Sequence, residues 1–127
     1  MKTWEKGMLI IVLGYCAMHL SILLHMVPHH MVWGGKIDSI EKLYLLEGFA
    51  LATMLFLGMV LAMKIKIIKP IFTAMAIKRI CMLFAVFFAL NTLGNLLAET
   101  LIEKSQAIIT LFLAITLFKS SQHFKSQ

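Results

Sequence analysis

The side chains in this sequence that could do chemistry are polar groups placed inside long apolar segments. Hydrophobic residues make up 61% of the 127 residues and charged residues only 14%. Hydrocarbon satisfies neither hydrogen bonds nor charges, so each polar group inside such a segment needs a partner or a function. The sequence therefore predicts a candidate site for a small ligand or a proton, formed by His19, Glu47, Asn91, Asn95 and Glu99.

His19 and Glu47 lie in different apolar segments and point to proton chemistry. Histidine is the side chain whose charge ordinarily changes between about pH 5 and 8, so a histidine coupled to a carboxylate suits proton-linked transport. A static hydrogen bond that holds two helices in register is the alternative interpretation, and it is favoured over proton transport. Pairing with His25 instead of His19 is also open at this stage.

Asn91, Asn95 and Glu99 are spaced four residues apart. On a helix this spacing places all three on one face, and Glu103 would extend the stripe if the helix continued. Two amides and a carboxylate must then face the interior of a bundle or a partner. At the helical rise per residue, the stripe, His19 and Glu47 all lie within roughly 12 Å of the outer membrane boundary, so a shared polar chamber is expected there.

Three histidines near the end of the first apolar segment form a candidate metal site: His25, His29 and His30. Ligands four residues apart on a helix can share a zinc ion, and a carboxylate from another helix would complete the set. Pro28 argues against this site, because proline ends or kinks a helix and so separates His29 from His25. No cofactor is expected, and no residue is assigned a catalytic role.

Four apolar segments must position these groups. They cover residues 7–27, 43–63, 80–98 and 105–121. A helix of roughly 17 to 25 apolar residues crosses a bilayer, so the sequence predicts an all-α protein, a single membrane domain formed by an antiparallel bundle of four transmembrane helices. A composition this apolar excludes a disordered chain and a soluble enzyme of ordinary type.

The positive charges predict the orientation of these helices. Of the twelve lysines and arginines, nine fall on the side that would hold both termini: Lys2, Lys6, Lys64, Lys66, Lys69, Lys78, Arg79, Lys119 and Lys125. Positive charge favours the cytoplasmic side, so we expect a protein of the bacterial inner membrane with both termini in the cytoplasm. These lysines lie in short stretches beside apolar segments, so the expected partner is anionic lipid and not nucleic acid.

Small residues recur at a spacing of four, which lets helices approach closely in lipid. Packing within the bundle is the favoured interpretation, and a homo-oligomer formed through one of these faces is the alternative. Cys16 and Cys81 are interpreted as small apolar fillers. The small-residue pairs are Gly48 and Ala52, Gly58 and Ala62, Ala85 and Ala89, and Gly94 and Ala98.

The segment between the first two apolar segments contains Trp33 followed by Gly34 and Gly35. A tryptophan at this place is typical of an anchor at the membrane interface. Asp38 or Ser39 is expected to cap the helix that follows.

In this segment and in three other stretches, the sequence resembles a group of small four-span bacterial membrane proteins. The resemblance rests on the histidine-rich end of the first span, Val32-Trp33-Gly34-Gly35-Lys36, the stretch 43–47, and Asn91-Thr92-Leu93-Gly94-Asn95. It implies the four-span topology and no activity. Small multidrug exporters share the size and span count, but they carry an essential carboxylate in the first helix, where this chain has none.

Three functions are consistent with these residues. The first is a non-catalytic membrane protein whose outer polar cluster is structural or binds a small ligand. The second is a proton- or cation-coupled transporter or channel that uses the same cluster. The third is a metal-dependent membrane enzyme built on the histidines.

Overall fold

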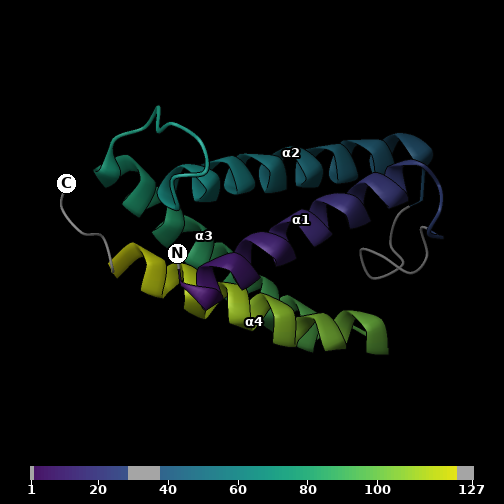
Figure 1. Ribbon diagram of the computed structural model, residues 1–127. Helices are drawn as coiled ribbons and strands as arrows, with labels where there is room; N and C mark the ends of the chain where they lie inside the picture. The colour runs from purple at the N-terminus through teal and green to yellow at the C-terminus, as the bar shows by residue number, and fades with distance from the viewer. Residues whose placement is uncertain (1, 29–37, 123–127) are drawn as a thin grey trace.

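The computed structural model describes residues 2–28 and 38–122, and within them it contains four α-helices and no strand (Figure 1). Each helix is long and apolar enough to cross a membrane. The expectation of an all-helical protein with four apolar helices is therefore confirmed. The helices are α1 (Thr3–Leu23), α2 (Ile40–Lys64), α3 (Ala74–Leu96) and α4 (Leu101–Gln122).

Hydroxyl side chains cap the N-termini of three of the helices. Ser39 Oγ accepts a hydrogen bond from the Lys42 amide at 3.2 Å, so of the two caps expected for α2, Ser39 is the one used. Thr73 caps α3 in the same way. Thr100 Oγ1 accepts from the Glu103 amide at 3.2 Å and donates to Glu103 Oε1 at 3.1 Å at the start of α4. Such bonds satisfy amide groups that the first helical turn leaves without partners.

Helix α1 ends earlier than its hydropathy predicts. Its chain turns at His25, which adopts a left-handed φ of 60°, and the Met26 amide bonds to the Ser21 carbonyl at 2.9 Å. This closing bond is that of a Schellman motif, which ends the helix at Leu23. The helix therefore ends four residues before the end of the expected segment 7–27, and His25 lies beyond it.

Helix α3 also differs from expectation. It begins at Ala74 and ends at Leu96, whereas hydropathy placed the segment at 80–98. Lys78 and Arg79 are helical residues that hydropathy excludes from the apolar segment. Capping hydrogen bonds decide where a helix starts, and long basic side chains can extend from a helix toward water, so apolar length alone misplaces the ends.

The helices pack as two pairs. Most contacts between helices join α1 to α2 and α3 to α4, with few between the pairs. Figure 1 shows the pairs spreading apart toward the end of the molecule where α1 ends and α2 begins.

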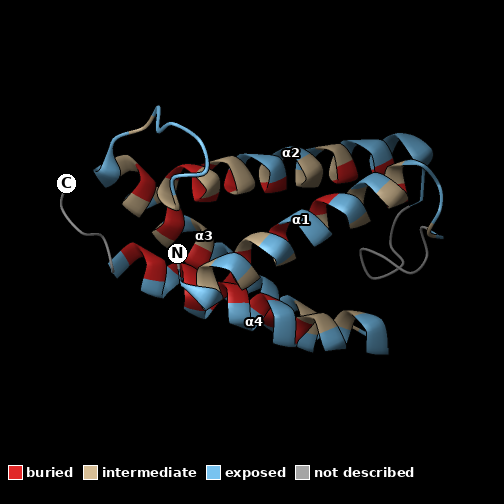
Figure 2. Cartoon of the chain, viewed as in Figure 1, coloured by how far each residue is buried: buried red, intermediate tan, exposed pale blue. Residues whose placement is uncertain are grey.

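A single apolar core joins the two pairs in one half of the molecule (Figure 2). All four helices contribute to it, with Met8, Val12, Leu57, Cys81, Leu113 and Leu117 among its most buried members. In the other half Ile22 and Leu43 form a small separate cluster between α1 and α2, and Ala107 is buried near the start of α4. The two pairs are thus tightly packed at one end only.

The outward faces of all four helices are apolar. Leu45 is 73% exposed on α2, Leu83 is 70% exposed on α3, and Ile108 is 75% exposed on α4. A helix that is hydrophobic on every side suits a membrane span, since lipid and neighbouring helices are both apolar.

The small-residue pairs do not all pack within the chain. A Cβ added at Gly58 would lie 3.6 Å from Val12 Cγ1, so this glycine allows α1 and α2 to approach closely. A Cβ at Gly48 or Gly94 would meet no atom within 4 Å among the described residues. Close packing inside the bundle accounts for the first glycine but not for the other two.

Candidate functional site

A cavity of about 560 Å³ lies between the two helix pairs, in the half where they diverge. Every helix contributes polar side chains to its wall. They are Tyr15 and His19 from α1, Glu47 and Thr53 from α2, Asn91 and Asn95 from α3, and Glu103, Gln106 and Thr110 from α4.

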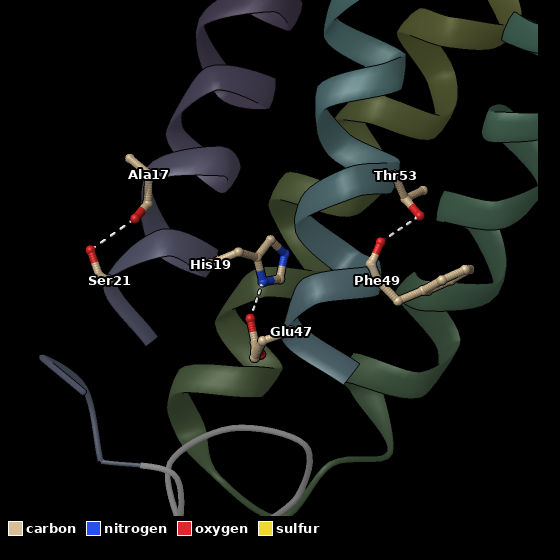
Figure 3. Close-up of polar contacts among 6 residues, drawn as sticks. All are labelled: Ala17, His19, Ser21, Glu47, Phe49 and Thr53. Atoms are coloured by element: carbon tan, nitrogen blue, oxygen red, sulfur yellow. Dashed lines mark hydrogen bonds and ion pairs between the residues drawn. The ribbon is translucent and has the colours of Figure 1, made fainter. Parts of the chain in front are cut away.

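His19 and Glu47 meet across the interface between α1 and α2 (Figure 3). His19 Nδ1 lies 2.5 Å from Glu47 Oε2, and the two side chains are 14% and 1% exposed. When Glu47 is a carboxylate it can only accept, so the histidine nitrogen then carries the hydrogen. A buried carboxylate is tolerated when it is paired, and this pair therefore ties α1 to α2.

A second polar contact joins α3 to α4 at the cavity wall. The hydroxyls of Thr92 and Thr110 lie 2.9 Å apart, and Asn95 Nδ2 makes a longer contact of 3.5 Å to Thr110 Oγ1. The Asn95 amide is thereby oriented, and its oxygen remains an acceptor.

Other groups on the wall have capacity to bind. The Tyr15 hydroxyl is buried and has no hydrogen-bond partner in the described part of the chain. The Thr53 hydroxyl donates to the Phe49 carbonyl at 2.8 Å and keeps its acceptor capacity (Figure 3).

The cavity opens between α2 and α3. Its exposed lining residues all come from these two helices: Phe49, Phe87, Asn91 and Gly94. Phe49 is 73% exposed and Phe87 is 43% exposed. The lining residues from α1 and α4 are buried or half-buried. Access from the surroundings is therefore through the gap between α2 and α3.

Four of the five residues expected at a ligand or proton site line this cavity: His19, Glu47, Asn91 and Asn95. Glu99 does not. Because α3 ends at Leu96, the helical stripe stops at Asn95, and Glu99 is exposed in the connection to α4. The carboxylate on this part of the wall is Glu103, which the next helix brings in.

Four polar residues of the cavity wall were missed from the sequence: Tyr15, Thr53, Gln106 and Thr110. Tyr15 precedes His19 by four residues and so lies on the same helical face. Gln106 follows Glu103 by three residues and precedes Thr110 by four, which is also the spacing of one face. These spacings could have identified Tyr15, Gln106 and Thr110.

The expected metal site is described only in part. His25 Nε2 lies 2.8 Å from the hydroxyl of Tyr44 in an exposed contact. His29 and His30 lie outside the described residues, as does the expected interface anchor Trp33. Among residues 2–28 and 38–122 no group of three His, Cys, Asp or Glu side chains could hold a metal ion. The histidine site stays a prediction.

Comparison of the chain with family models, with curated proteins and with solved structures finds no match. The geometry of the cavity is therefore the basis on which the function of the protein is inferred.

The His19–Glu47 pair predicts a coupled effect on stability. We expect Glu47→Leu and His19→Leu each to lower the free energy of unfolding by about 2 to 4 kcal/mol, because either change breaks a buried polar pair in an apolar region. The double variant should recover much of this loss. Unfolding in detergent, followed by circular dichroism, measures all three.

Tyr44→Phe is the matched control, since it removes the exposed contact to His25 and should change stability by less than about 1 kcal/mol. Strictly additive losses in the double variant would contradict the pairing.

Proposed function

We propose that the chain is a multi-pass protein of the bacterial inner membrane, folded as an antiparallel bundle with both termini in the cytoplasm. Two contacts support the antiparallel arrangement of α1 and α2. Lys64 Nζ bonds Glu5 Oε1 at 2.9 Å, and His19 pairs with Glu47, so residue numbers rise along α1 as they fall along α2. Short connections join the later helices.

The positive charges support the orientation. Within the described residues, Lys2, Lys6, Lys64, Lys66, Lys69, Lys78, Arg79 and Lys119 lie near the helix ends or in the connection that this topology places in the cytoplasm. Anionic headgroups of the inner leaflet would attract them. The same topology fits the proposed relation to small four-span bacterial membrane proteins.

We propose that the cavity binds a small molecule, and we assign its residues to binding and not to catalysis. The observation that carries this proposal is a cavity of about 560 Å³ lined by polar side chains of all four helices, among them the amides of Asn91 and Gln106, which make no side-chain hydrogen bond among the described residues. Sites for small ligands are typically concave, mostly apolar, and roughly 300 to 1,000 Å³ in volume, with a few polar groups that orient the ligand. A purely structural cluster would be expected to satisfy its own polar groups.

A proton- or cation-coupled transporter or channel is the second candidate. The observation in its favour is that the His19–Glu47 pair lines the same cavity as the other polar groups. A proton held by this pair would lie next to a bound ligand or ion, which is what coupling requires. A static pair would leave flux independent of these residues.

Self-association through small-residue faces is proposed as an addition to either function. Gly48 has open space beside it among the described residues, and Ala52 is exposed one turn further along α2. A second copy could approach closely along such a face.

Cysteine labelling tests the topology. In a variant lacking Cys16 and Cys81, a cysteine at Ser39 should react with a membrane-impermeant maleimide from outside intact cells. A cysteine at Lys66 should react only after the membrane is opened. Both positions are exposed, so burial does not limit the reaction. The reverse pattern would overturn the proposed orientation.

Blocking the cavity tests ligand binding. The probe for this test is 2-phenylethanol, a neutral molecule with an apolar ring and a hydroxyl. Saturation-transfer NMR in maltoside micelles would measure its affinity for the protein. Gly94→Phe should weaken specific binding at least about tenfold, because Gly94 lines the cavity and has room for a side chain.

Gly14→Phe is the control for this substitution. Gly14 is exposed, lies outside the cavity lining, and also has open space beside it. Equal binding by both variants and the unsubstituted protein would show that the probe only partitions into the micelle, and the proposed function would fail.

Flux measurements test the transport candidate. In proteoliposomes loaded with a pH-sensitive dye, a potassium diffusion potential should drive proton entry that His19→Ala and Glu47→Gln abolish. Glu99→Gln changes an exposed carboxylate outside the cavity and should leave the rate unchanged. Proton entry that is insensitive to both cavity substitutions would remove this candidate.

A further inference from the structure

The formal charges on the cavity wall are predominantly negative. Glu47 of α2 and Glu103 of α4 both line it, and no lysine or arginine is among the lining residues. His19 is the one basic side chain on the wall, and it is already bonded to Glu47. A bound anion would be repelled by the carboxylates and would have no positive side chain to pair with. A bound cation would have a carboxylate as its counter-charge.

Glu103 is the carboxylate best placed to meet a charged ligand. It is half-buried, and within the described residues it forms no ion pair. Its Oε1 accepts a hydrogen bond from Thr100 Oγ1 at 3.1 Å. A carboxylate has about four acceptor positions, so this bond leaves Glu103 able to accept several more.

Neutral acceptors share the wall with Glu103. Asn91 and Gln106 line the cavity, and neither side chain makes a hydrogen bond in the part of the chain that the structure describes. Their amide oxygens suit N–H donors. An ammonium group has three such donors and no acceptor.

The rest of the wall suits an apolar body. Aromatic rings come from Tyr15, Phe49, Phe87 and Phe88. Phe87 and Phe88 stack edge to face, with ring centres 5.3 Å apart. The faces of such rings attract cations as well as hydrocarbon. Phe49 and Phe87 flank the opening between α2 and α3, so an amphiphilic molecule meets aromatic surface first.

We propose that the ligand class of this cavity is a primary organic ammonium carried on an apolar, ring-sized body. The ammonium binds Glu103 and the amide oxygen of Gln106, which lies three residues further along α4, and the apolar body occupies the rest of the cavity. This inference rests on the proposed binding function and adds to it the charge and chemical type of the ligand.

Glu103 also has a structural task, which the test must keep separate. Its contacts with Thr100 cap α4. Glutamine serves in a capping box as well as glutamate does, so Glu103→Gln removes the charge and keeps the cap. Glu99→Gln is the matched control, since it is the same change at an exposed position outside the cavity.

The experiment compares three probes with one carbon skeleton and different charge: 2-phenylethylammonium, 2-phenylethanol and phenylacetate. Affinities are measured at pH 7 by saturation-transfer NMR in uncharged maltoside micelles. The cation should bind about tenfold more tightly than the alcohol, and the anion most weakly. Glu103→Gln should bring the cation to the affinity of the alcohol without changing the alcohol, and Glu99→Gln should change neither.

Each outcome decides between the proposals. Equal affinity for all three probes, preference for phenylacetate, or equal effects of the two glutamine variants would overturn the ligand class. If the alcohol still binds in a manner that depends on Gly94, the binding function survives that result. If none of the probes binds, the ligand class and the proposed function fail together.

A primary ammonium can come from a free amine or from a phosphatidylethanolamine headgroup. Nanodiscs of phosphatidylglycerol, with and without phosphatidylethanolamine, separate the two sources. If the lipid supplies the ligand, its presence should weaken 2-phenylethylammonium binding about tenfold by competition. Unchanged affinity in the two discs assigns the site to a free amine.

Discussion

The structure depends on one buried carboxylate and its need for a partner. Glu47 is the single charged residue in the apolar stretch 43–63 and is 1% exposed. His19 supplies the partner at 2.5 Å, and this bond sets the rotation of α1 against α2. The opposite faces of both helices are then free to be apolar. One unfavourable burial therefore orients two helices, because lipid offers that charge no alternative.

The same constraint explains why the bundle is packed at one end and hollow at the other. Where all four helices carry apolar side chains inward, they close into one core that includes Leu57, Cys81 and Leu117. Where they carry amides, carboxylates and hydroxyls inward, such close apolar packing would leave those groups without partners. The polar groups instead pair within each helix pair, as Thr92 and Thr110 do, and a cavity separates the pairs.

The position of the opening determines which kinds of molecule can enter the cavity. It lies between α2 and α3, the helices that meet across the two pairs with few contacts, and phenylalanines flank it. In the proposed membrane topology this gap faces lipid and not water. A ligand would then reach the acidic wall through an aromatic passage, which favours molecules that are both apolar and charged. The apolar composition is typical of a protein in lipid, and in the proposed topology the cavity opens toward that lipid.

The sequence alone determined the number of apolar helices, the all-α class, and the polar residues that needed explanation, because hydropathy and helical spacing are local properties. It also identified four members of the cavity wall, His19, Glu47, Asn91 and Asn95. Only the tertiary structure decided that Glu99 is excluded from the wall while Glu103 is included. The end of α3 at Leu96 and the divergence of the helix pairs decide this, and both depend on turns and on contacts between residues far apart in the chain.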